Sequence, residues 1–418
     1  MRRSRQAVAL ALLAAVLPAP ATARAAEHDG RLFGIDIQTP TSDAEFAAMR
    51  KGGVGTYRWS IPWPSVQHGI NSGFGWSGPD HVVAELARNG IEPLPVLYGS
   101  PCFIVECRGG EQVSPRPPID TPEARLGWAR FVAEAVRRYG RDGSFWSQRP
   151  SLPYRPIEVW QVWNEQNVPQ FYRPAPSVGG YARLLAISSR AIRGADPEAT
   201  VLLGGMPGET HQQGAIEGPR FLDDLYRIGA EGDFDAVAVH PYSQDFPGVR
   251  TQMAAVNRVL QEHGQEQTPV WVTELGWGVG AGARQGLFES PGGQAELLTR
   301  SFGFLASRRD AWNIERVLWY AWRDPPPGQP ACNWCRTAGL LDAAGNPRPA
   351  WTAFAELSGG TPVSPADLGG GGSPGRDVDG GGGILPWIAG AVALAVVGAT
   401  AAWLFRRRRS APRGRGSG

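Results

Sequence analysis

Two short stretches decide the fold: VWQVWNEQN at Val159–Asn167 and VWVTELGW at Val270–Trp277. Each begins as a run of β-branched and aromatic residues, which is typical of a buried strand, and each then reaches a glutamate, Glu165 or Glu274. A carboxylate at the end of a buried strand costs several kcal/mol unless it is paired or used. Two such strands at one rim of a sheet would bring two carboxylates together, which predicts an acid–base site.

Strand and helix patterns alternate along the middle of the chain. The predicted strands are Leu32–Gln38, Thr56–Trp63, Glu92–Tyr98, Ile157–Asn164, Val201–Gly205, Ala236–His240, Val270–Glu274 and Arg316–Trp322. The predicted helices are Asp43–Arg50, Asp80–Asn89, Pro122–Tyr139, Gly180–Gly194, Pro219–Gly229, Val249–His263, Gly293–Ser307 and Pro349–Leu357.

Near-continuous apolar strands separated by helices indicate a parallel sheet that is buried on both faces. Eight such units in about 330 residues predict an α/β fold, a (β/α)8 TIM barrel, whose reactive residues gather at the C-terminal ends of the strands. The alternative is a doubly wound open sheet. That fold would want a Gly-rich phosphate turn after an early strand, and Gly34–Ile37 is not one.

The N-terminal end indicates export. Met1–Arg5 is basic, Ala7–Leu17 is apolar, and small residues follow to Ala26. This is the pattern of a secretory signal peptide over residues 1–26. The apolar run is too short to cross roughly 30 Å of hydrocarbon. We therefore expect the domain that follows, residues 27–357, to be exported.

The C-terminal end predicts a membrane anchor. Ile384–Phe405 is an uncharged apolar stretch long enough to span a bilayer, and Arg406–Arg409 follows at once. Because positive charge stays on the cytoplasmic side, we expect a single-pass cell-membrane protein with the barrel outside and residues 406–418 as a cytoplasmic tail. Residues 358–383 are rich in Gly, Pro, Ser and Asp, which predicts a flexible tether. The sequence has no LPxTG sorting motif, which favours a retained span over covalent attachment to a wall.

The formal charge of +2 conceals an acidic outer part. Ten of the 41 basic residues lie in the signal, the anchor and the tail, which leaves 31 against 39 acidic residues, a charge of about −8. A mildly acidic ectodomain argues against nucleic acid as a partner.

Four cysteines form two local pairs, Cys102/Cys107 and Cys332/Cys335. In an exported protein they predict two disulfides, each closed locally. A redox dithiol and half a zinc site are the alternatives for Cys332/Cys335, but it lacks a thioredoxin-like βαβ context and a second ligand pair. Both pairs lie in long segments after the third and eighth predicted strands, where loops of this length usually shape a binding cleft.

Polar and aromatic residues stand at the ends of several predicted strands. They are Arg58, Asn164, Glu165, His240, Tyr242, Glu274, Trp319 and Trp322. Paired carboxylates at one rim are what glycoside hydrolysis needs. The set resembles clan A of the glycoside hydrolases, retaining (β/α)8 enzymes, and within it the family 39 and family 5 type. The resemblance runs from about Leu32 to Leu357 and is carried by the WNE and TELGW segments and by Gly339–Ala350.

The resemblance implies a role for each of these residues. Glu165 would protonate the leaving oxygen and later activate water, and Glu274, about 5–5.5 Å away, would attack the anomeric carbon. The acid must stay protonated while the nucleophile stays ionised. The other implied roles are a charge partner of Glu274 (Arg58), a hydrogen-bond donor to Glu274 (Tyr242), a contact to the sugar 2-hydroxyl (Asn164), a contact to sugar or a neighbour (His240) and a sugar platform (Trp322 or Trp319).

Two aspartates and the choice of platform stay open at this point. Asp36 and Asp324 follow predicted strands and carry no assigned role. Alternation along the eighth strand places Tyr320 and Trp322 on one face and Trp319 on the other, and it does not decide which tryptophan meets the sugar.

The sequence therefore predicts a cell-surface retaining glycosidase that acts on a polysaccharide or glycoconjugate. We expect a carbohydrate substrate, a monomeric ectodomain, and neither a cofactor nor a metal. A transglycosylase uses the same residues and stays open. A non-catalytic carbohydrate-binding protein is the third reading, although a decayed site readily loses costly buried charges such as Glu165 and Glu274.

Overall fold

The computed structural model describes residues 31–364, except for residue 211 and residues 281–285. The predicted signal peptide, membrane anchor and cytoplasmic tail lie outside the described residues, as does most of the predicted tether. Within the described part, no helix is both long enough and apolar enough to cross a membrane.

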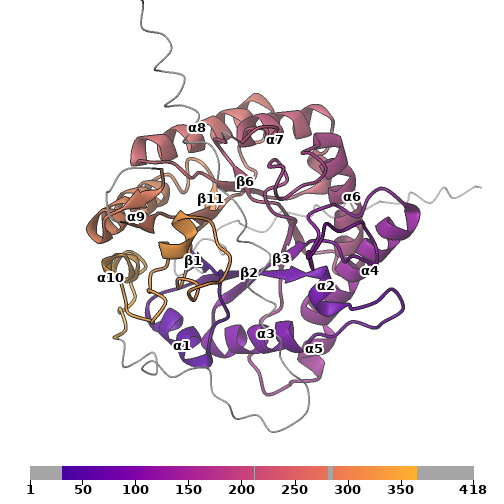
Figure 1. Cartoon of the computed structure of the whole chain (residues 1–418), viewed down its shortest axis with the longest axis horizontal. Helices are drawn as coiled ribbons and strands as arrows, with labels where there is room; N and C mark the ends of the chain where they lie inside the picture. Colours follow the sequence, from indigo (N-terminus) through magenta and orange to yellow (C-terminus); the bar gives the residue numbers. More distant parts are fainter. Residues whose placement is uncertain (1–30, 211, 281–285, 365–418) are drawn as a thin grey trace, which may run out of the picture.

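The strands form one curled parallel sheet at the centre of the molecule (Figure 1). They are β1 (Phe33–Asp36), β2 (Thr56–Pro62), β3 (Glu92–Tyr98), β4 (Val159–Val162), β5 (Thr200–Leu203), β6 (Met206–Pro207), β7 (Val237–His240), β8 (Val270–Leu275) and β11 (Ile314–Tyr320). The order is β5-β4-β3-β2-β1-β11-β8-β7-β6, so β1 pairs with β11 at the other end of the domain. A separate short pair, β9 (Gly278–Val279) and β10 (Phe288–Glu289), lies in the connection after β8.

The sheet closes on itself between β5 and β7. β6 pairs with β7, and Leu202 of β5 forms a parallel bridge to Ala236, which directly precedes β7. β5 and β6 therefore occupy one strand position in the ring. The result is a TIM-barrel-like fold, in agreement with the sequence prediction.

The break between β5 and β6 differs from the single predicted strand Val201–Gly205. A Cβ atom on Gly204 would lie 2.0 Å from Oε1 of Gln166, and one on Gly205 would lie 2.0 Å from Nε2 of His240. Real side chains do not approach so closely, so the two glycines leave room for these polar side chains at the wall of the barrel. The strand is interrupted where the site needs that space.

Helices surround the ring of strands (Figure 1). They are α1 (Asp43–Lys51), α2 (Trp63–Val66), α3 (Ser77–Asn89), α4 (Pro122–Tyr139), α5 (Ser144–Ser147), α6 (Val178–Ala195), α7 (Gly218–Arg227), α8 (Phe246–Glu262), α9 (Pro291–Ser307) and α10 (Pro349–Leu357), with short 3-10 turns η2 (Glu231–Asp233) and η3 (Trp334–Thr337). Their ends follow local chemistry: the Thr121 hydroxyl accepts from the Ala124 N–H at the start of α4, and α3 stops at Gly90, whose φ of 68° suits glycine.

The interior of the barrel is apolar at its N-terminal end. Side chains from five strand positions pack together there, namely Leu94, Leu202, Ala236, Ala238, Trp271 and Leu318. Below them Arg316 pairs with Glu92 at 2.6 Å and covers the Trp271 ring at 5.0 Å. This plug leaves the C-terminal ends of the strands as the place for a polar site.

The barrel continues past its predicted end at Leu357. The Ser358 hydroxyl donates to the Gly52 carbonyl at 2.9 Å, the Thr361 N–H donates to the Lys51 carbonyl at 2.8 Å, and Val363 is buried in the core. The predicted tether from residue 358 is therefore wrong for its first six residues, because these pack on the end of α1. Composition alone did not distinguish them from the segment that follows.

Two disulfides close locally, as predicted. Cys102 bonds Cys107 in the connection after β3, and Cys332 bonds Cys335 in the connection after β11. Within the described residues every cysteine is in one of these two bonds. The zinc alternative for Cys332/Cys335 disagrees with this bond, because zinc binds thiolates and both sulfurs are in the disulfide.

Candidate active site

Glu165 stands just beyond β4, on a turn that departs from the extended conformation. Trp163 has a φ of 70° and Glu165 a φ of 48°, both in the left-handed region that non-glycine residues seldom adopt. The turn is held because Trp163 is fully buried and its indole N–H donates to the Phe171 carbonyl at 2.7 Å. The Glu165 N–H also donates to the Gly205 carbonyl at 2.9 Å. Strain of this kind persists where the surroundings enforce it, and it is typical of functional sites.

Glu274 lies within β8 and is 4% exposed. Its Oε1 accepts from Nη1 of Arg58 at 2.7 Å, and its Oε2 accepts from the Tyr242 hydroxyl at 2.8 Å. The ring of His240 approaches Oε1 with Nε2 at 3.4 Å. Each carboxylate oxygen therefore has a fixed donor, which is what an ionised group needs inside a protein.

Arg58 connects four strands from its place in β2. Its Nε donates to Gln161 of β4 and its Nη2 to Oδ1 of Asn164, both at 2.7 Å. Its Nη1 contacts Glu274 of β8 at 2.7 Å and Asp36 of β1 at 3.0 Å. The planar fork of arginine can serve all these acceptors at once, and a lysine point charge cannot. Because Asn164 accepts through Oδ1, its amide N–H2 remains as a donor.

His240 lies between the two glutamates. Its Nδ1 is 3.0 Å from Oε1 of Glu165, and its Nε2 is 3.0 Å from the Thr273 hydroxyl. Burial lowers the pKa of His240 well below its ordinary value, and the nearby Arg58 charge lowers it further. The imidazole is therefore neutral, so one ring nitrogen donates while the other accepts.

The two carboxylates sit in electrostatically unequal places. Burial raises the pKa of Glu165 well above its ordinary value, and the charge of Glu274 adds to this rise while Arg58 opposes it. Burial also raises the pKa of Asp36 to about 8, although Arg58 beside it acts in the opposite direction. Asp36 thus holds its proton at neutral pH and Glu165 holds its proton to a higher pH than an ordinary glutamate, whereas Glu274 has the donors Arg58 and Tyr242 directed at it.

The structure brings six of the eight predicted site residues together: Arg58, Asn164, Glu165, His240, Tyr242 and Glu274. Trp319 and Trp322 are elsewhere. Trp319 is fully buried and donates to the Ala338 carbonyl at 3.1 Å, and Trp322 is 1% exposed and donates to Glu45 at 3.0 Å. The prediction of a sugar platform at either ring disagrees with this burial, because neither ring has an open face.

Four further residues belong to the site and were not assigned from the sequence. They are Asp36, Gln161, Thr273 and Tyr320. Burial and the neighbouring Glu274 charge raise the pKa of Tyr320, so it is a neutral phenol. Asp324, the other open aspartate, instead forms an ion pair with Arg348 at 2.5 Å and a hydrogen bond to the Gly339 N–H, so its role is to hold the loop after β11.

Two clusters among the described residues have the donor atoms for a metal ion. In one, Glu165, His240 and Glu274 each offer an atom, and these atoms lie within 4.8 Å of one another. The other, Asp43, His81 and Glu85, lies on α1 and α3 at the surface. In the first cluster every donor atom already has the hydrogen-bond partners described above. The prediction of a metal-free site stays a prediction.

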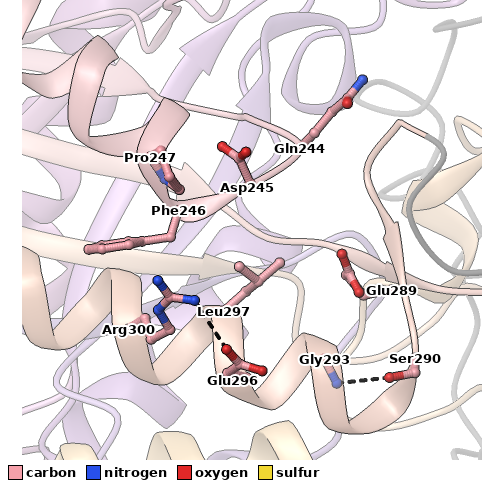
Figure 2. Close-up of a pocket in the computed structure, with 10 residues that line it drawn as sticks. All are labelled: Gln244, Asp245, Phe246, Pro247, Glu289, Ser290, Gly293, Glu296, Leu297 and Arg300. Atoms are coloured by element: carbon pink, nitrogen blue, oxygen red, sulfur yellow. Dashed lines mark hydrogen bonds and ion pairs between the residues drawn. The ribbon is translucent and has the colours of Figure 1, made fainter.

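A hollow of about 480 Å³ lies beside the start of α8 and α9 and contains none of the predicted site residues (Figure 2). Three of its charged groups have local partners: Asp245 caps α8 through the Gly248 N–H at 2.9 Å, and Glu296 pairs with Arg300 at 3.1 Å. This hollow is therefore separate from the paired glutamates.

Comparisons with known proteins agree with the geometry. A family model described as the glycosyl hydrolase catalytic core matches residues 197–354, which include Glu274 and His240. A search of curated proteins found no match.

Three solved structures share the fold. A family 39 glycoside hydrolase from the gut symbiont Bacteroides cellulosilyticus WH2 has a TM-score of 0.59 at 23% identity, over 79% of this chain and 64% of its own. The GH39 enzyme from Xanthomonas axonopodis pv. citri has a TM-score of 0.59 at 17% identity, over 79% and 66%. The GH5_18 protein from Bifidobacterium longum subsp. longum ATCC 55813, solved with Manb1-4GlcNAc, has a TM-score of 0.57 at 14% identity, over 79% and 78%. This chain thus spans just under two thirds of the length of the first two.

Proposed function

We propose that the chain is a retaining glycosidase of the clan A type, with Glu165 as acid/base and Glu274 as nucleophile. The glycosyl hydrolase family model over residues 197–354 and the fold shared with family 39 and family 5 proteins support this proposal. One observation carries the proposal: one oxygen of Glu165 and one oxygen of Glu274 lie within 4.8 Å of each other. Retaining enzymes keep their carboxyl groups about 5–5.5 Å apart, whereas inverting enzymes leave about 6.5–9.5 Å for a water molecule.

The first chemical step forms a covalent intermediate. Glu274 attacks the anomeric carbon while the bond from that carbon to the leaving oxygen breaks, and Glu165 gives its proton to this oxygen. The raised pKa of Glu165 supports the role of acid, because a carboxyl group that keeps its proton near neutral pH has one to give. With Oε1 of Glu165 facing His240, Oε2 is the oxygen left to face the leaving group.

The second step returns both groups to their starting state. Glu165, now ionised, takes a proton from water, and the water oxygen attacks the anomeric carbon. The bond to Glu274 breaks, and this carboxylate is received again by Arg58 and Tyr242. The free amide donor of Asn164 is placed to bind the sugar 2-hydroxyl, an interaction that strengthens in the transition state of these enzymes.

The test is a panel of aryl β-glycosides with NMR of the first-formed product. The panel covers xylosides, mannosides, glucosides and galactosides, because proteins with this fold include a β-xylosidase, an exo-β-1,4-mannosidase, a glucosidase and a β-galactosidase. We expect the β-anomer to appear first and a 2-fluoro glycoside to label Glu274 in a peptide map. The α-anomer as first product would overturn the retaining mechanism. A protein that binds these sugars without cleaving them would overturn the enzymatic role.

We further propose that the enzyme acts at the cell surface, on a polysaccharide or glycoconjugate. The support is the sequence at the two ends: a signal-like segment at Met1–Ala26, and an apolar span at Ile384–Phe405 followed by four arginines. Protease added to intact cells should release an active domain of about residues 27–364 by cutting beyond Val363. Activity confined to the cytosolic fraction would contradict this placement.

A further inference from the structure

The loop Cys332–Cys335, here called the CNWC loop, reaches the candidate site through Trp334. Cys332, Trp334 and Cys335 are 7–8% exposed, and they pack with Tyr320, Ala321 and Ala338 at the end of β11. The sequence predicted a disulfide here, in a loop of the kind that shapes a binding cleft, and assigned Trp334 no role. The burial of these residues indicates that the CNWC loop does more than cross-link two positions at the surface.

Trp334 contacts two tyrosines of the site. Its ring centroid is 4.9 Å from that of Tyr242 and 5.5 Å from that of Tyr320, with interplanar angles of 63° and 62°. Edge-to-face pairs of this kind are stabilising beyond the apolar area that they bury. Tyr242 is the residue whose hydroxyl donates to Oε2 of Glu274. Trp334 therefore contacts the residue that is hydrogen-bonded to the proposed nucleophile.

The CNWC loop is itself fixed from three directions. Nε2 of Gln38, just after β1, donates to the Cys335 carbonyl at 2.8 Å, and the Tyr320 hydroxyl donates to Oε1 of the same Gln38 at 3.0 Å. On another side, a Cβ atom on Gly278 would lie 2.4 Å from the Trp334 carbonyl oxygen, so β9 approaches the loop backbone closely. The disulfide closes the third side.

We propose that Trp334, held by the Cys332–Cys335 disulfide, is a positioning residue that keeps the Tyr242 hydroxyl on the nucleophile Glu274. The inference rests on the proposed function for the identity of the nucleophile. A phenol is free to turn about two side-chain torsions, and the hydrogen bond to Oε2 forms only in one arrangement. Trp334 packs edge-to-face against the phenol and restricts it to that arrangement.

The kinetic test is a double-mutant cycle on kcat with an aryl glycoside. Tyr242→Phe removes a hydrogen bond to a charged group, and we expect it to lower kcat roughly 10–100-fold. Trp334→Ala should lower kcat about tenfold in the parent enzyme with little change in KM, and less than about twofold when Tyr242 is already Phe. Equal losses in both backgrounds would overturn the proposal, because a merely structural tryptophan would act independently of the Tyr242 hydroxyl.

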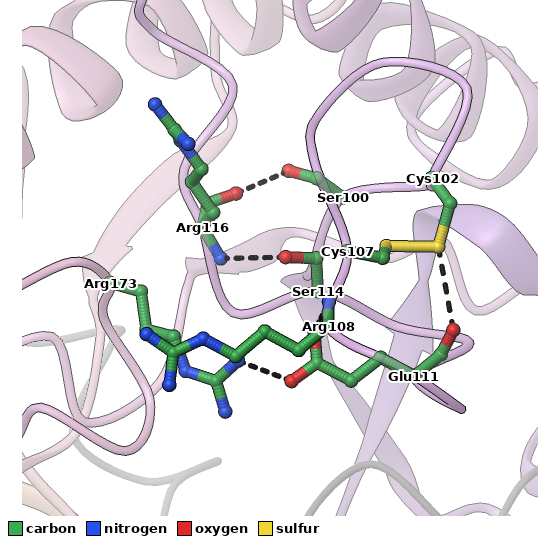
Figure 3. Close-up of a disulfide and its surroundings, with 8 residues drawn as sticks. All are labelled: Ser100, Cys102, Cys107, Arg108, Glu111, Ser114, Arg116 and Arg173. Carbon is green, nitrogen blue, oxygen red and sulfur yellow. Dashed lines mark hydrogen bonds and ion pairs between the residues drawn. A yellow bond between two sulfur atoms is a disulfide. The ribbon is translucent and has the colours of Figure 1, made fainter.

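The second disulfide gives a matched control (Figure 3). Cys102–Cys107 also closes a short loop, and Ser100 and Ser114 pair their backbones beside it. Among the described residues, no hydrogen bond or ion pair joins residues 102–107 to the partners of Glu274. Cys332→Ser with Cys335→Ser should therefore lower kcat severalfold and Cys102→Ser with Cys107→Ser should change it less than about twofold. Equal effects of the two pairs would count against the proposal.

Crystal structures of the parent protein and Trp334→Ala decide the inference without a substrate. We expect the Tyr242 hydroxyl to leave Oε2 of Glu274 in Trp334→Ala, and to stay near the 2.8 Å of the parent in the conservative Trp334→Phe. A Tyr242 hydroxyl that keeps this hydrogen bond in Trp334→Ala would overturn the proposal. A parent protein that cleaves no glycoside would overturn the proposed function, and the position of Tyr242 would still decide this one. If Trp334→Ala does not fold, Trp334→Leu and the Cys332/Cys335 variant replace it in both tests.

Discussion

The two glutamates both approach His240, yet they differ in the number of hydrogen-bond donors around them. Glu274 has donors on both oxygens, from Arg58 and Tyr242. Glu165 has a side chain 12% exposed, and among the residues that the structure describes His240 is its one side-chain partner. Glu274 is thus held by fixed donors on both oxygens, whereas Glu165 has few hydrogen-bond partners.

This difference shows how one site can support both nucleophilic attack and proton transfer. Fixed donors favour the ionised form of a carboxylate, which suits a group that must attack carbon. Burial with few donors favours the protonated form, which suits a group that must give and take a proton, and Glu165 has the raised pKa that this requires. Neutral His240 can hydrogen-bond to Glu165 without adding a positive charge that would ionise it.

The largest effect is expected at Glu274, the carboxylate with donors on both oxygens. Glu274→Gln keeps the size and removes the nucleophile, so the covalent route closes for every substrate. The loss of kcat should exceed the roughly 10²–10⁴-fold that acid–base catalysis contributes. Steady-state turnover of an aryl glycoside measures it, with a thermal melt to show that the variant is folded. A variant that keeps a tenth of the parent activity would mean that another group attacks.

Replacing Glu165, the carboxylate with few hydrogen-bond partners, should reduce activity less, by an amount that depends on the leaving group. Glu165→Gln should cost roughly 10²–10⁴-fold for an alkyl glycoside, whose leaving oxygen needs a proton. A dinitrophenyl glycoside needs none, so its first step should approach the parent rate, seen as a burst of phenol. The basic limb of the pH–rate profile should also disappear, because the acid with the raised pKa is gone. Equal losses for both leaving groups would exclude Glu165 as the acid.

The third prediction weakens the contrast by removing the charge that creates it. Arg58→Met takes away the cation that lies 2.7 Å from Oε1 of Glu274, so the nucleophile loses its positive partner and kcat/KM should fall by tenfold or more. Turnover of an aryl glycoside measures the loss, with a thermal melt to show that the variant is folded. Arg58→Lys should recover part of it, because an ammonium keeps the charge and loses the fork that reaches Gln161 and Asn164. A folded Arg58→Met variant that keeps nearly all of the parent activity would make Arg58 purely structural.

The sequence located this site well for a topological reason. Parallel strands of a closed barrel bring their C-terminal ends to one rim, so Arg58, Asn164, His240 and Glu274 could be grouped although more than two hundred residues separate the first from the last. Gln161 also carried a signal, a polar residue within the apolar run VWQVW, which was not used. Its amide is what Arg58 needs as an acceptor in the wall of the barrel.

Other features depend on packing that periodicity does not encode. Alternation was extended to Trp322, but β11 ends at Tyr320, so the rule stops applying just before that residue. The gap at Gly204–Gly205 follows from the volumes of Gln166 and His240, which the sequence does not place beside it. Trp334 lies on a loop without a regular period, and its contact with Tyr242 follows from the packing of the CNWC loop on the end of β11 and against β9.

The smallest expected effect concerns Asp36, the carboxylate that shares Nη1 of Arg58 with Glu274. Its pKa is raised from an ordinary value near 4 to about 8 by burial, so between these pH values the folded protein keeps a proton that the unfolded chain releases. Stability from this group is therefore greatest below about pH 4 and falls as pH rises toward 8, by at most about 1.4 kcal/mol per pH unit.

Asp36→Asn removes this titration while keeping the shape of the side chain. The Tm of the variant minus that of the parent should therefore increase from pH 5 to pH 8, by about 2 °C for each kcal/mol in a domain of this size. Asp310→Asn, at an exposed aspartate after α9, is the control, and its difference should stay level over the same range. A level difference for Asp36→Asn as well would mean that Asp36 is ionised throughout. Arg58 would then contact two ionised carboxylates, Asp36 and Glu274, and would divide its charge between them. That would weaken the contrast between Glu274 and Glu165.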